Sequence, residues 1–447
     1  MREILPENLL KLADACQFSL YIVGGSVRDY LRGELKNTDW DIAFPAPEDE
    51  LLAVAERCGF DVEAVYRNTG TVKLEDDLGV GYEFTRFRSD KYVRGLHAPS
   101  EITFTEDIEK DAVRRDFCAN AVYYDIKRAE FCDPLGGIED IHRKILRTVA
   151  PASKVFGEDG LRLMRLARIA AQTGFSPDEE CLCGAREHAA LVRDIVPERI
   201  FHELTLLLHS DELGGKDAPY RGLKLLHETG VLREILPELT LGEGMAQRKD
   251  FHDHDVLEHS LRCVRYSAPE IRFAALLHDV GKPYCFLQSG SYHAHPEEGA
   301  RLTHEIMARL KAPKKLTEET EKLVLWHMRD YNLQMKEGKL RRELVEYYPL
   351  LDKLLLLKQA DFSACKDDLS EAPCVQKWKD VLQKMRQEGV PFRISELAVD
   401  GKDVQAAGVP APETGKVLCE LLFYCAEDGR RNDREKLLKK LSKKQEY

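Results

Sequence analysis

The stretch YIVGGSVRDYLRGELKNTDWDIAF, residues 21–44, combines a buried strand, a glycine turn and two closely spaced carboxylates. The apolar residues before Gly24 and Gly25 predict a strand, and the residues after these glycines predict a helix that begins near Ser26. Glycine lets the backbone approach a ligand closely, and the first N–H groups of a helix are free to bind a phosphate. The stretch therefore predicts a phosphate-binding turn that follows a buried strand.

The carboxylates of this stretch are Asp39 and Asp41, which flank Trp40 at the start of the apolar run DIAF. On a strand, residues i and i+2 lie on one face, so both carboxylates are expected to point the same way. Like charges on one face repel each other unless a cation lies between them, and oxygen ligands suit Mg²⁺. Such a pair alone is more often a turn cap beside a solvated edge residue. The preceding glycine turn favours the metal site.

Length and composition are typical of a globular protein with several domains. The chain has 447 residues, of which 43% are apolar and 32% charged, and its formal net charge is −12. The cysteines include no CxxC pair, and the first residues lack the basic and apolar regions of a signal peptide. We therefore expect a cytoplasmic protein without a membrane span. The acidic balance argues only weakly against a nucleic-acid partner, because local patches set such contacts.

Four motifs, in chain order, resemble those of the class II tRNA nucleotidyltransferase and poly(A) polymerase family, a branch of the polymerase-β-like nucleotidyltransferases. They are GGSVRDYLRG followed by DWD in residues 24–41, DAVRRDFCANAVYYD in 111–125, FGEDGLRLMRLARIAAQTGF in 156–175 and PERIFHEL in 197–204. Three positions depart from the family pattern. Cys118 and Ala119 replace Thr and Ile, and Gly160 replaces Pro.

Three arginines of the third motif, Arg162, Arg165 and Arg168, are spaced so that they line one arc of a predicted helix that includes residues 161–171. Their neighbours are mostly apolar, which favours a polyphosphate and base site over a solvated charged stripe. The resemblance implies that Asp159 and Arg162 hydrogen-bond the Watson–Crick edge of CTP or ATP. It also implies that Arg165 and Arg168 support the nucleotide.

The resemblance assigns the remaining contacts by position. Gly25 and Arg28 would bind the triphosphate, and phosphate or sugar would be contacted by Arg115, Asp116 and Asn120. Two Mg²⁺ ions would be held by the catalytic Asp39 and Asp41. Glu83, on the predicted strand GVGYEFTRF, is a candidate third carboxylate, and a solvent-facing strand residue is the alternative. Residues 89–106 are the expected flexible loop, which would help the site change from CTP to ATP.

Histidines and aspartates of the later segments HDHDVLEHSL, RFAALLHDVGKP, YHAHPEEGA, LWHMRD and QADFS follow the order found in the HD phosphohydrolase superfamily. Imidazole mixed with carboxylate suits a divalent transition metal such as Ni²⁺, Mn²⁺ or Co²⁺. The resemblance assigns one metal ion to His259, His278, Asp279 and Asp361, and it assigns substrate phosphate or a second metal to His295 and His327. His252 and His254 are left unassigned. The alternative is a domain that keeps the fold and only places the tRNA.

The fold class expected from these motifs is α+β, with a polymerase-β-like nucleotidyltransferase head built on a mixed sheet and an all-helical remainder. We expect four parts: a catalytic head in residues 1–145, a nucleotide-selecting neck in 146–210, a body with the HD domain in 211–365 and a tRNA-binding tail in 366–447. The basic end of the tail, GRRNDREKLLKKLSKK, is either a solvated helix or a contact surface for the tRNA backbone.

The implied function is the template-independent addition of CCA to the tRNA 3′ end from CTP and ATP, with release of pyrophosphate. The segment EFTR, residues 83–86, differs from the GRRFR-type segment of bacterial poly(A) polymerases and speaks against that activity. Enzymes that add only CC or only A share every motif, so both alternatives stay open. In a second alternative the HD domain is the main activity, as a metal phosphohydrolase or phosphodiesterase. The expected partners are tRNA, CTP and ATP.

Overall fold

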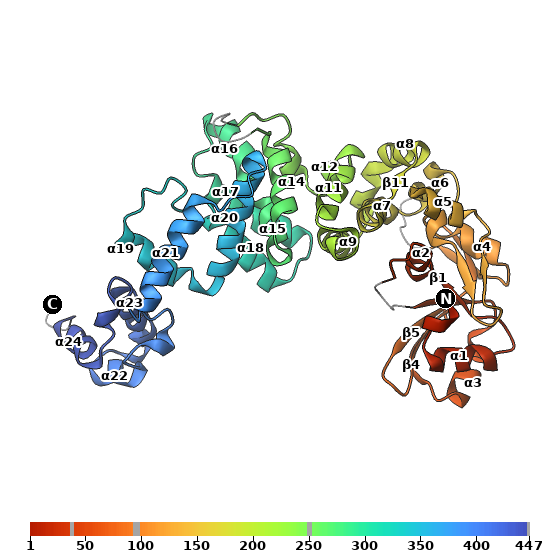
Figure 1. Ribbon diagram of the computed structural model, residues 1–447, viewed down its shortest axis with the longest axis horizontal. Coiled ribbons are helices and arrows are strands. Elements are labelled where there is room, and N and C mark those ends of the chain that lie inside the picture. Colours follow the sequence, from red (N-terminus) through yellow and green to blue (C-terminus); the bar gives the residue numbers. More distant parts are fainter. Residues whose placement is uncertain (36–39, 93–98, 248–252, 445–447) are drawn as a thin grey trace. The chain divides into compact units, whose positions relative to one another are not determined.

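The computed structural model describes residues 1–35, 40–92, 99–247 and 253–444 and comprises two compact units (Figure 1). The N-terminal unit is Met1–Thr240 and the C-terminal unit is Leu241–Tyr447. The N-terminal unit thus extends past residue 210, where the sequence predicts the end of the neck, and the four-part division stays a prediction. Among the described residues, each helix is too short or too polar to cross a membrane.

A seven-stranded mixed sheet is the centre of the head. Its strands, in spatial order, are β3 (Asp61–Tyr66), β4 (Thr71–Glu75), β5 (Gly81–Arg86), β2 (Asp41–Phe44), β1 (Tyr21–Val23), β8 (Tyr123–Asp125) and β9 (Glu130–Cys132). The pair β2 and β5 is parallel, and the other neighbours are antiparallel. The central strands are short and apolar, so both of their faces are covered. The predicted mixed sheet is confirmed.

A second, two-stranded sheet lies within the segment predicted to be a flexible loop. Strands β6 (Arg88–Lys91) and β7 (Glu101–Phe104) pair antiparallel, with Arg88 opposite Phe104. The prediction of a loop over all of residues 89–106 is therefore wrong for these strands, because cross-strand hydrogen bonds outweigh the polar composition of the segment. The residues between them that lie outside the description are 93–98.

Helices cover the sheet and continue into the neck. They are α1 (Glu7–Ala15), α2 (Gly25–Leu31), α3 (Glu48–Arg57), α4 (Ile108–Val113), α5 (Gly137–Arg143), α6 (Ala152–Glu158), α7 (Leu161–Thr173), α8 (Glu179–His188), α9 (Pro197–Leu208), α10 (Asp211–Gly214), α11 (Ala218–Glu228), α12 (Val231–Ile235) and α13 (Pro237–Thr240). A short parallel pair, β10 (Ile145–Leu146) with β11 (Ser176–Pro177), connects the end of the head to the segment after α7. Helix α7 contains the predicted arginine stripe and buries its Leu, Met and Ile side chains.

The C-terminal unit is helical throughout its described residues. Its helices are α14 (Val256–Tyr266), α15 (Arg272–Leu277), α16 (Gly281–Ser289), α17 (His295–Arg309), α18 (Lys314–Trp326), α19 (Glu337–Glu346), α20 (Leu351–Lys366), α21 (Pro373–Gln387), α22 (Gly401–Ala406), α23 (Thr414–Ala426) and α24 (Arg434–Lys444). Helices α14, α15, α17, α18 and α20 carry, or end directly before, the metal-ligand candidates of the sequence analysis: His259, His278, His295, His327 and Asp361. A separate apolar core joins α22, α23 and α24 at the C-terminal end.

Candidate active site

The glycine turn between β1 and α2 places backbone directly beside Asp41. Gly24 has φ +84°, which disfavours any residue with a side chain, and a Cβ there would lie 3.2 Å from Oδ2 of Asp41. Asp41 is the first residue of β2, and its side chain is exposed. Asp39 lies outside the described residues. Glycine at position 24 therefore lets the turn lie directly against the Asp41 carboxylate.

The candidate third carboxylate, Glu83, lies beside Asp41 in the sheet. The parallel register of β2 and β5 pairs Asp41 with Glu83, so both side chains leave the same face. Glu83 also forms an ion pair of 3.2 Å with Lys73, and both of these side chains are more than 40% exposed. The role of Glu83 at the metal site stays a prediction.

A cavity of about 300 Å³ opens next to the glycine turn. It is lined by Gly24, Gly25, Asp41, Arg114, Arg115, Asp116, Asn120, Asp159, Leu161, Arg162, Arg165 and Arg199. This lining includes all the predicted nucleotide-binding residues except Arg28 and Arg168. Five arginines face three aspartates across the cavity, so its charge suits a polyanion such as a nucleoside triphosphate.

Arg28 does not line the cavity, but it binds Asn120, which does. Its guanidinium donates to both carboxylate oxygens of Asp29 at 2.9 Å, and Nη1 donates to Oδ1 of Asn120 at 2.7 Å. Asn120 in turn donates to Oδ1 of Asp116 at 3.1 Å. Arg28 thus orients Asn120, whereas the sequence predicts a direct contact of Arg28 with the triphosphate.

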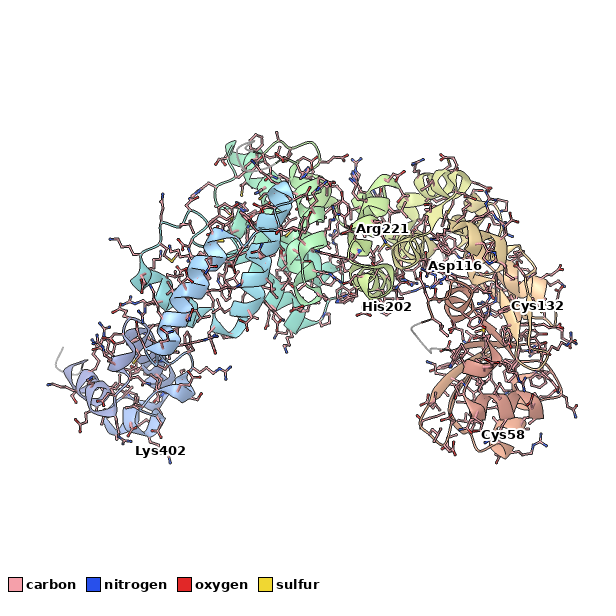
Figure 2. All side chains as sticks on the ribbon, viewed as in Figure 1. Cys58, Asp116, Cys132, His202, Arg221 and Lys402 are labelled. Carbon is pink, nitrogen blue, oxygen red and sulfur yellow. The ribbon has the colours of Figure 1, made fainter. Side chains whose placement is uncertain are left out.

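Asp116, labelled in Figure 2, forms an ion pair with Arg165 of the neck helix α7. Its Oδ2 lies 2.6 Å from Nη2 of Arg165, and its other oxygen accepts from Asn120. Burial alone would raise the pKa of Asp116, but the charge of Arg165 and these hydrogen bonds hold it well below its usual range. The carboxylate is therefore ionised and connects two nucleotide-binding motifs that are distant in sequence.

Glu203 is a buried partner of the arginine stripe that sequence reasoning missed. It lies on α9, is 5% exposed, and its Oε2 accepts from Nε of Arg168 at 2.6 Å. Its other oxygen lies 3.9 Å from Nη1 of Arg165. Arg168 therefore supports the site from behind. The available signal was an acid on the apolar face of α9, next to Leu204, because a buried carboxylate requires a partner.

The two residues predicted to read the base, Asp159 and Arg162, both line the cavity. Arg162 is 5% exposed, and its guanidinium donates to the carbonyl oxygens of Val155 at 3.0 Å and Arg114 at 2.7 Å. It also donates to Oε2 of Glu158 at 3.1 Å. These bonds hold the guanidinium in one orientation, which a side chain that reads base edges requires.

Asp159 has a cationic neighbour that the sequence analysis did not single out. Its Oδ1 accepts from the backbone N–H of Leu161 at 3.0 Å, and Oδ2 lies 3.6 Å from Nη2 of Arg199. Arg199 lies on α9 and lines the same cavity. The base-reading carboxylate is thus fixed on one oxygen and faces a cation on the other.

Asp111 organises the two arginines that precede Asp116. It accepts from Tyr123 Oη at 2.7 Å, from Arg114 Nε at 2.8 Å and from Arg115 Nη2 at 3.0 Å. Burial would raise the pKa of Asp111, but the charges of Arg115 and Arg114 lower it to about 2. The ionised carboxylate holds both guanidinium groups at the rim of the cavity.

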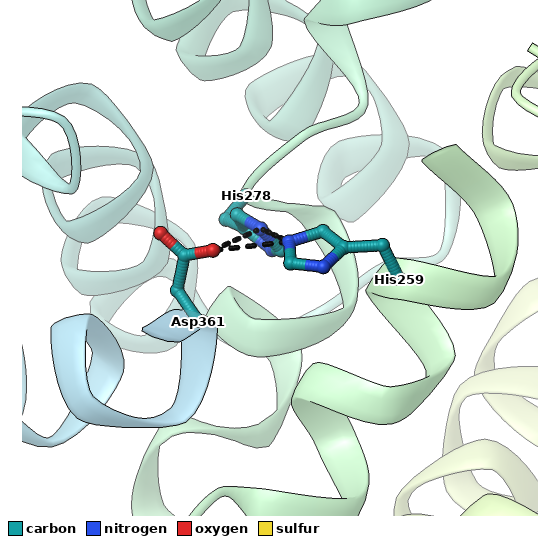
Figure 3. Close-up of side chains that lie close together, drawn as sticks. All are labelled: His259, His278 and Asp361. Atoms are coloured by element: carbon teal, nitrogen blue, oxygen red, sulfur yellow. Dashed lines mark hydrogen bonds and ion pairs between the residues drawn. The ribbon is translucent and has the colours of Figure 1, made fainter. Parts of the chain in front are cut away.

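The first donor group of the C-terminal unit is His259, His278 and Asp361 (Figure 3). Nε2 of His259 lies 3.2 Å from Nε2 of His278 and 3.0 Å from Oδ1 of Asp361. All three side chains are buried, and they come from α14, the end of α15 and α20. Residues distant in sequence therefore present ligand atoms to one point.

The second donor group is Asp279, His295 and His327. Nε2 of His295 lies 3.3 Å from Nε2 of His327 and 3.4 Å from Oδ1 of Asp279. The other oxygen of Asp279, Oδ2, lies 3.3 Å from Nε2 of His278 in the first donor group. The sequence assigns Asp279 to the same metal as His259, and this assignment stays a prediction: Oδ2 of Asp279 lies 3.5 Å from Nε2 of His259, while its Oδ1 faces the second donor group.

The histidine tautomers leave nitrogen lone pairs facing the centre of the cluster. Nδ1 of His278, His295 and His327 bonds to the carbonyl oxygens of Ala275, Tyr292 and Val324, so Nδ1 donates and Nε2 is left to accept. Burial lowers the pKa of His327 to about 4, which keeps the ring neutral. Facing lone pairs repel without a cation, so the donor set fits divalent metal ions.

A larger cavity of about 690 Å³ adjoins the second donor group. Its lining combines aromatic, cationic and acidic side chains: Lys282, Tyr292, His293, Ala294, His295, Pro296, Glu297, Leu325, Trp326, Met328, Arg329, Glu346 and Tyr347. Trp326 and Tyr347 stack with ring centroids 4.3 Å apart, and Nζ of Lys282 lies 2.6 Å from Oδ2 of Asp279. His254 belongs to neither donor group, and His252 lies outside the described residues.

Comparison with family models divides the chain into three matched regions. Residues 20–147 match the poly A polymerase head domain, residues 174–241 match the "Probable RNA and SrmB- binding site of polymerase A", and residues 256–361 match the HD domain. The motifs that line the first cavity and both donor groups fall mostly within these regions.

Named relatives are similar over most of their length. An A-adding tRNA nucleotidyltransferase of Deinococcus radiodurans is 31% identical over 89% of this chain and 89% of its own. A multifunctional CCA protein of Neisseria gonorrhoeae is 32% identical over 69% of this chain and 73% of its own. The chain therefore belongs to the tRNA nucleotidyltransferase/poly(A) polymerase family, as its motifs indicate, and it carries an HD domain.

Solved structures support the same fold. The Bacillus stearothermophilus CCA-adding enzyme in complex with CTP matches with a TM-score of 0.68 and 25% identity over 99% of this chain and 98% of that one. The Thermotoga maritima CCA-adding enzyme complexed with tRNA matches with a TM-score of 0.58 and 18% identity over 98% of this chain and 94% of that one. The α+β head with a helical remainder is confirmed.

Proposed function

We propose that this protein adds the complete CCA sequence to the 3′ end of tRNA from CTP and ATP. The observation that carries the proposal is the single cavity where the glycine turn and Asp41 meet the base-reading pair Asp159 and Arg162. The tRNA 3′-hydroxyl oxygen attacks the α-phosphorus, the bond to the β-phosphate oxygen breaks, and pyrophosphate leaves. The hydroxyl proton passes to solvent.

The head residues orient the triphosphate for this displacement. Asp41 and Asp39 would hold Mg²⁺, which would lower the pKa of the hydroxyl and neutralise the triphosphate charge. The Asp41 carboxylate lines the same cavity as the glycine turn, which supports this assignment. Arg115 and Asn120 contact phosphate or sugar, and Arg28 acts on the nucleotide by holding Asn120.

The neck residues select the nucleotide. Arg162 is oriented by two backbone carbonyls and presents its remaining hydrogen-bonding capacity to the base, and Asp159 presents the oxygen that faces Arg199. Guanine or uracil would leave hydrogen-bonding groups of the site without partners, and sites built around such bonds discriminate strongly for that reason. Cytosine and adenine are selected by hydrogen bonds that they satisfy.

The parts of the chain follow from this reading. We assign the head to residues 1–145, the neck to 146–210, the body with the HD domain to 211–365 and the tail to 366–447, in a cytoplasmic enzyme. The matched RNA-binding region, residues 174–241, supports a tRNA contact that begins in the neck. The basic helix α24 would provide a separate contact with the tRNA backbone, which makes binding dependent on salt.

A transcript lacking its 3′ CCA tests the proposal. The tRNA is incubated with Mg²⁺ and CTP alone, ATP alone or both, and the products are sized on a gel. Two added nucleotides with CTP and three with both are expected. No extension of this transcript, with a single A added to a second transcript that ends in CC, would identify an A-adding enzyme, the activity named for the Deinococcus relative. A stop after CC would indicate a CC-adding enzyme, and a long ladder with ATP a poly(A) polymerase.

We further propose that the HD domain hydrolyses phosphoesters with a divalent transition metal ion. The two donor groups would hold the metal, and the adjacent cavity would take the substrate, with Lys282 next to the phosphate. Bound metal supplies a polarised phosphoryl oxygen and a more acidic water. Chelation followed by addition of Ni²⁺, Mn²⁺ or Co²⁺, with a cyclic-phosphate nucleotide as substrate, tests this activity. No turnover with any of these ions would leave the domain a structural role.

A further inference from the structure

Lys358 is a buried lysine on α20 whose hydrogen bonds go to backbone. It is 2% exposed, and its Nζ donates to the carbonyl oxygens of His327 at 2.7 Å and Arg329 at 2.6 Å. The ammonium also lies 4.7 Å from the ring centroid of Trp378 on α21. One cation therefore connects three segments: α20, α21 and the turn that follows α18.

This contact lies at the C-terminal end of α18, which ends at Trp326 with His327 as its C-cap. The last carbonyl groups of a helix have no partner within the helix, and a cation is favourable there. Lys358 supplies both the hydrogen bonds and the charge. It therefore stabilises the turn in the conformation that the structure shows.

The same turn carries a residue of the second donor group. The ring of His327 is fixed on one side, because Nδ1 donates to the carbonyl oxygen of Val324 at 2.6 Å. The backbone of His327 is fixed on the other side by Lys358. Lys358 also precedes Asp361 of the first donor group by three residues, so both project from neighbouring positions of α20.

We propose that Lys358 is a positioning residue for the second donor group, because it holds His327 at the distance and orientation that a metal ion requires. Its bond to Arg329 places a residue of the adjacent cavity in the same way. The inference rests on the proposed metal-dependent function of the HD domain. Residues that orient metal ligands in this manner change metal affinity by about 10- to 100-fold when they are substituted.

Lys377 provides a matched control on α21. Its Nζ donates to the carbonyl oxygens of Leu333 and Met335, each at 3.0 Å, and forms an ion pair of 2.8 Å with Asp330. It is thus a second lysine that binds backbone carbonyls of the same connection, but beyond the metal-donor residue. Its loss would disturb the connection without releasing His327.

The test compares the full-length variants Lys358→Met, Lys358→Arg and Lys377→Met. All of them also carry Asp41→Ala, which removes a carboxylate of the proposed metal site in the head and so limits Co²⁺ binding there. Co²⁺ is the probe, with stoichiometry measured after dialysis and the visible d–d spectrum followed during titration. The reference chain is expected to bind two ions. Lys358→Met should retain one and bind the other about 10- to 100-fold more weakly. Lys358→Arg should restore it, and Lys377→Met should not change it.

Two results would overturn the inference while leaving the proposed function intact. In the first, Lys358→Met binds Co²⁺ with the affinity and the spectrum of the reference chain. In the second, Lys377→Met loses as much Co²⁺ affinity as Lys358→Met, which would indicate general destabilisation. If the reference chain bound no Co²⁺, the proposed function of the HD domain and the inference would both fail. Thermal unfolding checks that each variant is folded. If Lys358→Met does not fold, Lys358→Gln, which keeps an N–H donor with a shorter reach, must weaken affinity in the same direction.

Discussion

Replacing Glu203 by Gln should loosen the neck without changing which nucleotide is chosen. The substitution keeps the shape of the side chain but removes the charge that Arg168 contacts at 2.6 Å. Breaking a buried ion pair costs about 3–5 kcal/mol when one partner is deleted. Because Gln keeps an acceptor for Nε of Arg168, we expect Glu203→Gln to lower the local stability of the neck by a smaller amount, about 2 kcal/mol. This corresponds to a roughly 30-fold larger open population of the affected segment.

Hydrogen exchange measures this effect locally. In the full-length protein, amides of α7 and α9 that exchange through local opening should exchange roughly 30-fold faster in Glu203→Gln than in the wild type. The KM values for CTP and ATP should rise together if Arg165 and Arg168 support either nucleotide, as we propose. Glu198→Gln on the exposed side of the same helix is the control and should behave as the wild type.

The reasoning would be refuted by wild-type exchange in α7 together with unchanged KM values, since Glu203 would then not restrain the stripe. A change in the ratio of CTP to ATP use, without faster exchange, would also contradict it. That result would mean that Glu203 acts on the base rather than on the arginines.

Three further predictions concern the head and the neck. Asp41→Ala should abolish nucleotide transfer while tRNA binding persists, as measured by gel extension and a binding titration, and retained incorporation would refute the metal assignment. Arg162→Ala should blur the choice between CTP, ATP, GTP and UTP in single-nucleotide extension, and unchanged selectivity would refute its role at the base. Asp111 has a pKa of about 2 in the fold, below its ordinary value of 3.8, so its contribution of about 2 kcal/mol is complete above pH ~4 and is lost as the pH falls toward 2. Between about pH 4 and about pH 2 the free energy of unfolding should therefore fall more steeply in the wild type than in an Asp111→Asn variant, as measured by acid unfolding followed by circular dichroism. Identical pH slopes in the two proteins would contradict this linkage.

The sequence by itself determined the family, the fold class and most of the first cavity. Motif spacing reports local geometry well, because three-residue steps on α7 place Arg162 and Arg165 on one side whatever surrounds the helix. The glycine turn likewise predicts a close backbone approach, and Gly24 has the positive φ that this requires. Asp39 lies outside the described residues, so its place beside Asp41 stays a prediction.

Tertiary structure decided which groups meet across elements. Local spacing could not predict that Glu203 on α9 binds Arg168, or that Arg28 holds Asn120 behind the cavity, because these contacts depend on helix packing and sheet register. The same holds for the position of Asp279, which the resemblance assigns to the metal of His259 and which also reaches the second donor group. Its two oxygens face different donor groups because α15, α17 and α18 converge on it from separate parts of the chain, and only their packing sets those distances.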